Sequence, residues 1–538
     1  MKRHKYLIAF TMLLGLALGG CKKKFLEYSQ NPNEPPVVPP SQLLRTIEDS
    51  MYVAPFGQDE RNDQFTCSNY NYYDDNAYWD GVFHSQYATL HYGTLTNVLN
   101  MISSAKAAAD TTLNPYDAMG KFFEAYFFVD MTMKVGDLPM TDALQGSANL
   151  TPKYNTQEQI FIQALKWLDT ANTEMGEVIK NEGLGISYEF SGDSYFADAL
   201  GSAPATVEWQ KAINAFRLRV LVELSNQASD ANLNLAAQFS AILNNPTQYP
   251  LMTSMSDNVE FVYNTQYNNY PNNNQVFGTQ ALRYNMAAAY EDSLASFNDL
   301  RVMMVSEPAR GLGFPDTSYQ SFKGANTGLP LSTMAGGVGS NSTNIYSLIG
   351  RHRYYETLVG EPTFIISYPE MCLNIAEGIN RGWAAGSAAQ WYQTGIFADF
   401  SFYGVQDGVN QVVFQQPSGS LGVDTTYTVH FSYANYMSQP LVQYAGNNAH
   451  GLEQILEQKN IVYFRNTGLE AYYQWRRTQV PGWLQGSAQS GYGNGGNIPL
   501  RFQYPQDEVN SNSVNYQAAV QSQYGGSDNI NEAMWLLK

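Results

Sequence analysis

Residues 452–516 read LEQILEQKNIVYFRNTGLEAYYQWRRTQVPGW, then a glycine-rich gap, then IPLRFQYPQDEVNSNSVNY. The apolar and long side chains of the first part recur at helical spacing, which predicts a helix from Leu452 to Tyr463. Gly468 interrupts it, and residues 469–477 are predicted to form a second, short helix. Three arginines belong to this stretch, and we expect them to make buried ion pairs that hold the C-terminal segment to the helices, with an anion clamp as the alternative: Arg476, Arg477 and Arg501.

The composition of the chain is that of a globular protein with few charges. The chain has 538 residues, of which 44% are hydrophobic, 14% aromatic and only 14% charged. The 38 tyrosines are numerous enough to place tyrosine side chains on the surface as well as in a core. The net charge of −18 argues against nucleic acid as a partner, because phosphates need a basic surface. Neutral ligands such as sugars are compatible with this charge.

The N-terminus has the pattern of a lipoprotein signal. Lys2, Arg3 and Lys5 precede an apolar run that is too short to span a membrane, and Leu-Gly-Gly-Cys then ends at Cys21. We expect residues 1–20 to be a signal peptide, Cys21 to be lipidated, and the proline-rich residues 21–40 to form a tether. An ordinary signal peptide followed by a chance cysteine is the alternative.

The other two cysteines, Cys67 and Cys372, are too few for a disulfide framework. They are expected to be buried free thiols, and a single disulfide between them is the alternative.

Helical patterns dominate the rest of the chain. Residues 116–134 are apolar nearly all round and so predict a buried helix, and Thr156-Gln157-Glu158-Gln159 is a capping box that opens another. Residues 369–382 and 387–400 predict a helical hairpin like one tetratricopeptide unit. Helices are also predicted, in whole or in part, at residues 41–52, 82–109, 209–224, 230–243 and 279–294. Residues 401–446 are predicted to leave the helical scaffold and to form loop.

Two predicted loops, residues 69–80 and 263–270, mix tyrosine with short polar side chains. Aromatic rings suit the faces of a sugar ring, and amides and carboxylates suit its hydroxyls. We expect both to line one exposed binding face. In the first loop, rings such as Tyr78 and Trp79 could equally pack in the core, and the second could equally be a disordered, asparagine-rich surface loop. The candidate ligand-binding residues are Tyr70, Tyr72, Tyr73, Asp74, Asn76, Tyr78, Trp79, Tyr263, Tyr267 and Tyr270.

Signatures of an enzyme are absent from the sequence. It contains no His-Glu-x-x-His and no Gly-x-Ser-x-Gly, and Gly491-Tyr-Gly-Asn-Gly-Gly496 neither follows a strand nor opens a helix. We therefore predict no catalytic residue, no cofactor and no metal site. A glycoside hydrolase using Asp74, Asp75 and Asp80 is the alternative from a different class.

The C-terminal pieces, in their order and spacing, resemble the signature of SusD/RagB-type nutrient-binding lipoproteins of the outer membrane. These pieces are Gln458-Lys459, Trp475-Arg476-Arg477-Thr478, Ile498-Pro499-Leu500-Arg501 and Tyr504-Pro505 with Glu508, Asn510 and Asn515-Tyr516. The phrases FLEYSQNPNEPP, GDLPMTDAL and WQKAINAFRLRVLVELS resemble other parts of such proteins.

The resemblance implies a mostly α fold, in which an irregular tetratricopeptide-like scaffold carries a loop-rich subdomain. Residues 41–538 would form this binding domain, with the scaffold mainly at 41–245 and 365–400 and the loop-rich parts mainly at 246–364 and 401–538. It further implies a lipid-anchored protein, facing the cell exterior, that binds a nutrient and passes it to a TonB-dependent SusC-like transporter. An oligosaccharide is the expected ligand, and a peptide, as in RagB-type members, is the alternative.

Overall fold

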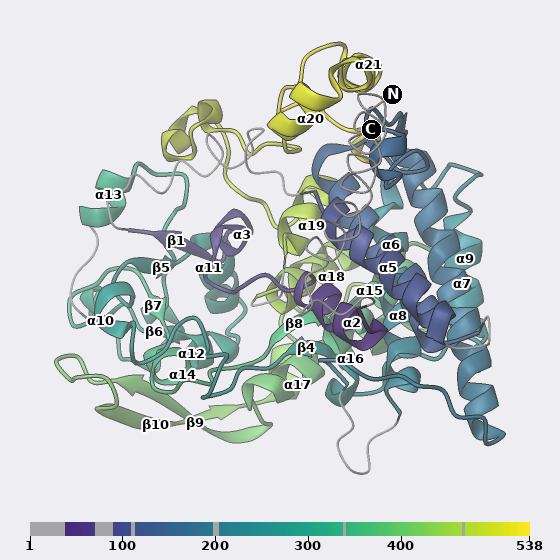
Figure 1. The fold of residues 1–538 in the computed structure, drawn as a ribbon. Coiled ribbons are helices and arrows are strands. Elements are labelled where there is room, and N and C mark those ends of the chain that lie inside the picture. The colour runs from purple at the N-terminus through teal and green to yellow at the C-terminus, as the bar shows by residue number, and fades with distance from the viewer. Residues whose placement is uncertain (1–37, 70–89, 109–112, 197–203, 337–340, 465–467) are drawn as a thin grey trace, which may run out of the picture.

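The computed structural model describes residues 38–69, 90–108, 113–196, 204–336, 341–464 and 468–538. A helical scaffold and a loop-rich part with short strands lie side by side (Figure 1). This arrangement confirms the predicted fold class. Among the described residues, none of the helices is both long and apolar enough to cross a membrane.

The scaffold is built from long helices that pack on their neighbours in sequence, α5 on α6, α6 on α7 and α7 on α8. α15 and α16 form the predicted hairpin, and α15 also packs on α8 and α18. The scaffold helices are α2 (Pro40–Asp49), α5 (Tyr92–Ala108), α6 (Pro115–Val135), α7 (Gln157–Gly183), α8 (Ala205–Glu223), α9 (Leu235–Asn244), α15 (Tyr368–Asn380), α16 (Ala388–Tyr403), α18 (Ala449–Val462) and α19 (Glu470–Thr478).

Local sequence signals fix where several of these helices begin. The hydroxyl of Thr156 accepts a hydrogen bond from the Gln159 N–H, and the side chain of Gln159 accepts one from the Thr156 N–H, which is the predicted capping box of α7. α6 is buried on almost every face, as its apolar sequence predicted.

The loop-rich part is built on a small antiparallel sheet in the order β1-β5-β7-β6, surrounded by short helices. A second pair, β4 with β8, joins this part to the scaffold, because β8 leads directly into α15. The elements are α3 (Gln58–Asn62), β1 (Thr66–Ser68), β4 (Val259–Phe261), α10 (Phe277–Gln280), β5 (Tyr284–Met286), α11 (Ala288–Ser296), α12 (Arg301–Val305), β6 (Ser306–Glu307), α13 (Leu331–Gly336), β7 (Leu348–Ile349), α14 (Arg351–Tyr355) and β8 (Thr363–Ile366).

The single helix predicted for residues 279–294 is wrong. The chain there forms α10, then β5, then α11. β5 pairs with β1 on one side, where Met286 lies opposite Thr66, and with β7 on the other. The hydrogen bonds of two neighbouring strands therefore override the local helical preference of this stretch.

Residues 401–446, predicted to be loop, contain a β-hairpin. β9 (Gly408–Gln415) and β10 (Asp424–Phe431) pair in antiparallel register, and α17 (Tyr433–Met437) follows them. Both strands are rich in β-branched and aromatic residues, which favour strands, although apolar and polar residues do not alternate strictly along them.

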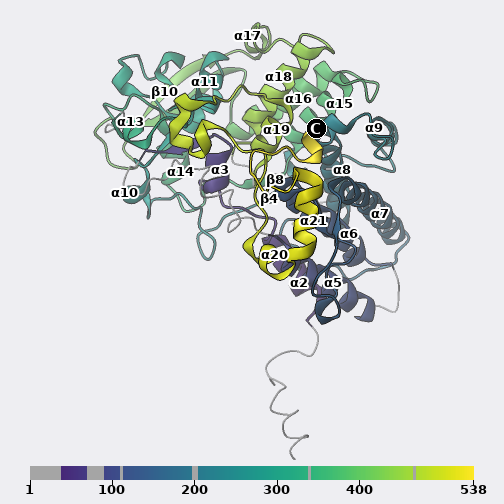
Figure 2. The ribbon, with the colours of Figure 1, turned by 90° about the horizontal axis from the view of Figure 1, so that it is seen from above.

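The C-terminal segment returns to the first half of the chain. The Phe502 N–H donates to the Lys134 carbonyl at 2.8 Å, the Tyr524 hydroxyl donates to the Val135 carbonyl at 3.0 Å, and the Leu536 N–H donates to the Gln157 side chain at 2.9 Å. α20 (Gln506–Ser511) and α21 (Ser513–Tyr524) consequently lie against the scaffold, as both views show (Figures 1 and 2). The last elements of the chain thus close the α6–α7 end of the scaffold.

Cys67 and Cys372 are both buried and both free, so the expectation of free thiols is confirmed.

Candidate binding cavity

The first predicted loop and the lipidation site lie outside the described residues. These are Cys21, Tyr70, Tyr72, Tyr73, Asp74, Asn76, Tyr78 and Trp79. The chain before the loop is anchored, because the Asn69 N–H donates to the Arg283 carbonyl and the Asn69 amide donates to Asn285. The role of this loop stays a prediction.

The second predicted loop turns out to bury two of its three tyrosines. Tyr263 is 3% exposed and Tyr270 is 1% exposed, whereas Tyr267 is 88% exposed. The Asn264 N–H donates to the Asn268 carbonyl, which closes a turn with Tyr267 at its tip. The expectation that Tyr263 and Tyr270 offer exposed rings is therefore wrong, and only Tyr267 lies on the surface.

The contacts of Tyr263 and Tyr270 explain their burial. The two rings meet edge to face, with their centroids 4.9 Å apart. The Tyr263 hydroxyl lies 2.7 Å from the hydroxyls of both Thr363 and Tyr52. Gly360 lies against the Tyr270 ring so closely that a Cβ there would come within 2.3 Å of it. Tyr263 therefore holds Tyr52 in position, and Tyr270 packs behind Tyr263.

Tyr52 itself lines a cavity of about 560 Å³ between α6, α8 and α19, a volume within the usual range for small-molecule sites. The end of α2, the start of α3 and Phe502 complete its wall. The lining residues that the structure describes are Ser50, Met51, Tyr52, Val53, Gln58, Asp59, His91, Tyr126, Val129, Asp130, Met133, Lys134, Phe216, Arg219, Val220, Glu223, Gly468, Leu469, Glu470, Tyr473 and Phe502.

Helical periodicity brings these side chains to one place. On α6, Tyr126, Asp130 and Lys134 follow at intervals of four residues and so share one face. On α8, Phe216, Arg219 and Glu223 follow at intervals of three and four residues and also share one face. This site was not predicted from the sequence, although the charged residues inside an apolar helix such as α6 were a signal for it.

The charges of the cavity are largely paired within its wall. The Lys134 ammonium donates to Asp130 at 2.8 Å, and His91 lies 3.3 Å from the same carboxylate. Burial opposes both charges, yet Lys134 holds the pKa of Asp130 well below its ordinary value, and Asp130 raises the pKa of Lys134. The pair is thus fully ionised at neutral pH.

On the opposite wall, Arg219 reaches two carboxylates. It donates two bonds to Glu370, at 2.6 and 2.5 Å, and one to Glu470 at 3.2 Å. Burial raises the pKa of Glu470 to about 7, even though Arg219 acts to lower it. Glu470 can therefore both donate and accept hydrogen bonds near neutral pH.

The Tyr473 side chain lines the cavity. Its hydroxyl is buried and has no hydrogen-bond partner among the residues that the structure describes. Such a group carries a cost unless something bonds to it. Aromatic faces, spare hydroxyl capacity and a titrating carboxyl together suit a small polyhydroxylated ligand.

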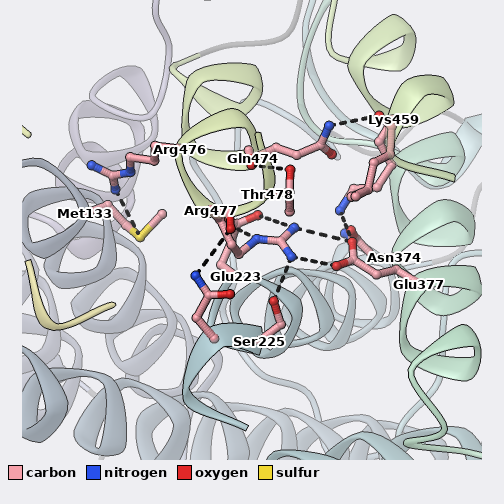
Figure 3. Close-up of polar contacts among 12 residues, drawn as sticks. Met133, Glu223, Ser225, Asn374, Glu377, Lys459, Gln474, Arg476, Arg477 and Thr478 are labelled. Atoms are coloured by element: carbon pink, nitrogen blue, oxygen red, sulfur yellow. Dashed lines mark hydrogen bonds and ion pairs between the residues drawn. The ribbon is translucent and has the colours of Figure 1, made fainter. Parts of the chain in front are cut away.

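Arg476 and Arg477 contact the cavity-lining residues Tyr473 and Glu223 (Figure 3). Of the three arginines of the C-terminal signature, Arg477 and Arg501 make the predicted buried ion pairs. Arg477 binds Glu377 at 2.6 Å and Glu223 at 3.3 Å, and Arg501 binds Asp528 at 2.6 Å. Buried carboxylates thus occupy Arg477, which speaks against an anion clamp.

Arg476 differs from the other two arginines. Within the described ranges its guanidinium bonds to the Leu500 carbonyl and lies over the Tyr473 ring, 4.5 Å from the centroid, instead of meeting a carboxylate.

A family model described as "Starch-binding associating with outer membrane", of the SusD-like type, matches residues 32–505. No match was found among curated proteins.

Solved structures share the whole fold. A SusD homologue from Bacteroides fragilis NCTC 9343 is 27% identical with a TM-score of 0.77, and the match covers 93% of this chain and 100% of that one. An outer-membrane protein from Bacteroides vulgatus ATCC 8482, assigned to nutrient binding, is 25% identical with a TM-score of 0.74 and the same coverage. A second SusD homologue from B. fragilis NCTC 9343 is 27% identical with a TM-score of 0.73, covering 93% of this chain and 99% of that one. This chain belongs to the SusD-like family.

Proposed function

We propose that this protein is a cell-surface lipoprotein that binds an oligosaccharide and delivers it, chemically unchanged, to a TonB-dependent SusC-like transporter in the outer membrane. The observation that carries the proposal is the match of the starch-binding, outer-membrane family model over residues 32–505. The family consists of binding proteins, which agrees with the lack of catalytic motifs in the sequence.

Two regions are candidates for the ligand site. The first is the pair of tyrosine-containing loops predicted from the sequence, residues 70–79 and the loop that carries Tyr267, whose tyrosines and amides would stack on sugar rings and bond their hydroxyls. The second is the cavity, where Tyr52, Tyr126 and Tyr473 supply rings and Glu470 supplies a carboxyl. A peptide is the alternative ligand in both.

Calorimetric titration against a panel of oligosaccharides and peptides tests the ligand class, with product analysis of the same mixtures. Saturable binding of a glycan without a new product supports the proposal. Binding of peptides alone would identify the RagB-like alternative, and hydrolysis products would identify an enzyme.

Matched variants distinguish the two regions. Tyr73→Ala with Trp79→Ala alters the first region, and Tyr473→Phe removes only the free hydroxyl in the cavity. Loss of one neutral hydrogen bond weakens binding by about 0.5–1.5 kcal/mol, or roughly 2- to 12-fold. Tyr188→Phe, on a tyrosine outside the cavity wall, is the control and leaves affinity unchanged. If ligand binds normally to both variants, both assignments of the site fail.

The lipid anchor is tested with Cys21→Ala. This change should abolish acyl labelling and release the protein from the membrane fraction. Continued labelling of the variant would contradict the assignment of Cys21.

The transporter is tested by purification from membranes in mild detergent. We expect a large β-barrel protein to copurify with the chain, and repeated recovery of the chain alone would count against delivery to such a partner.

A further inference from the structure

Three metal-ligating side chains meet where the loop-rich part contacts the β9–β10 hairpin. His352 lies on α14, Glu356 follows the last residue of that helix, and Asp424 opens β10. The His352 Nδ1 lies 2.8 Å from a Glu356 oxygen and 3.1 Å from an Asp424 oxygen. One ligand atom from each residue lies within 4.8 Å of the other two, which is the only such group among the described residues.

The backbone holds this group in place from both sides. His352 and Glu356 have the (i, i+4) spacing that puts two side chains on one helical face. Asp424 lies opposite Gln415 in the hairpin register, and the Arg351 guanidinium, next to His352, bonds to the Gln415 side chain. The three ligand atoms therefore come from two elements that are already fixed to each other.

The two carboxylates are short of partners. The side chains of Glu356 and Asp424 are 19% and 15% exposed. The second oxygen of each is buried without a hydrogen-bond partner within the described part of the chain. One imidazole thus faces two crowded carboxyl groups, and a divalent cation would satisfy both.

We propose that His352, Glu356 and Asp424 form a binding site for a divalent ion of the zinc type, with water in the fourth position. Zinc takes nitrogen and oxygen ligands in tetrahedral geometry at about 2.0–2.2 Å, which places neighbouring ligand atoms ~3.3 Å apart. The contacts of 2.8 and 3.1 Å need to open only slightly for this. Calcium prefers six to eight oxygen ligands, a set that these residues do not provide.

The bound ion would cross-link two elements of the fold. By bridging α14 and β10, the ion would fix the β9–β10 hairpin to the loop-rich part. This role is independent of sugar binding, so it stands or falls separately from the proposed function.

The test is a titration of the tag-free, metal-stripped protein with zinc chloride, read by competition with a chromophoric chelator. We expect one tight site per chain and a rise in melting temperature as zinc saturates it. Asp424→Asn, which keeps the side-chain shape, and His352→Asn, which removes the imidazole, should each weaken zinc binding by at least about tenfold and abolish the rise in melting temperature.

His450 provides the matched control, because it also contacts a glutamate, Glu453 at 3.4 Å, but lies outside the three-ligand group. His450→Asn should bind zinc like the wild type. Magnesium and calcium chloride should not displace zinc, and cobalt in its place should give the intense visible absorption of a tetrahedral site.

Absence of saturable zinc binding, or equal affinity in the wild type and both ligand variants, would overturn the proposal. Melting curves without metal show whether the ligand variants are folded.

Discussion

Glu377 is the residue on which the C-terminal signature converges. Its carboxylate is fully buried and receives Arg477 at 2.6 Å, Lys459 at 2.8 Å and Arg381 at 2.9 Å. These cations hold the pKa of Glu377 well below its ordinary value, in spite of the opposing effect of burial. The carboxylate therefore keeps its charge to a lower pH than an ordinary glutamate does.

Glu377→Gln should destabilise the protein strongly. The amide keeps the volume but removes the negative charge, which leaves Lys459 and Arg477 buried with less compensation. Breaking a buried ion pair on one side typically costs about 3–5 kcal/mol, measurable by urea denaturation. Glu453→Gln, which alters an exposed pair with His450, should change stability by less than about 0.5 kcal/mol. Equal effects of the two changes would contradict this role of Glu377.

At the scale of the elements, α15 packs on several helices, and its one glycine, Gly378, allows a close approach. A Cβ at Gly378 would come within 2.2 Å of the Phe239 ring on α9. Phe239 is itself fully buried, so the ring has little room to move.

Gly378→Ala should therefore destabilise the protein by about 1–3 kcal/mol, although alanine favours helix. Gly93, near the start of α5, has no atom within 4 Å of the added carbon, so Gly93→Ala should be neutral or slightly stabilising. Denaturant midpoints of the two variants measure the difference. A stabilised Gly378→Ala variant would mean that α9 and α15 are not packed in this way.

The elements also show how far the sequence alone could lead. α7 and the α15–α16 hairpin were predictable because a capping box, a first-turn proline and an apolar stripe are local signals. β5 was not, since its hydrogen-bond partners in β1 and β7 lie far away in the chain. The same holds for the candidate site: composition found the tyrosines, but only the fold shows that Tyr263 and Tyr270 face inward and that three helices enclose a cavity.

For the molecule as a whole, buried carboxyl groups set the pH dependence of stability. Burial raises the pKa of Glu291 to about 8, and those of Glu124, Glu457 and Glu470 to about 7. Between the ordinary value of 4.5 and these raised values, the folded state holds more protons than the unfolded state. The free energy of unfolding should therefore fall as the pH rises from 5 to 8.

Glu291→Gln isolates one of these groups, because glutamine keeps the shape and cannot ionise. Relative to the wild type, the variant should gain up to ~1.4 kcal/mol of stability per pH unit between pH 5 and 7, measured by urea denaturation at each pH. Glu453, which is exposed, provides the control: Glu453→Gln should show no such trend. A difference between wild type and Glu291→Gln that does not vary with pH would refute the assignment.

The return of the C-terminal segment to α6 and α7 has a consequence for how the chain acquires its structure. The hydrogen bonds of Tyr524 to Val135 and of Leu536 to Gln157 join residues 389 and 379 positions apart. Contacts of such high sequence separation carry a large loop-closure cost, so they slow folding. During synthesis, the apolar side chains at the α6–α7 end of the scaffold therefore stay exposed to solvent until the C-terminal helices have been made. The C-terminal segment thus covers this apolar surface, and a nascent chain that stops before Tyr524 would be a substrate for chaperones and proteases.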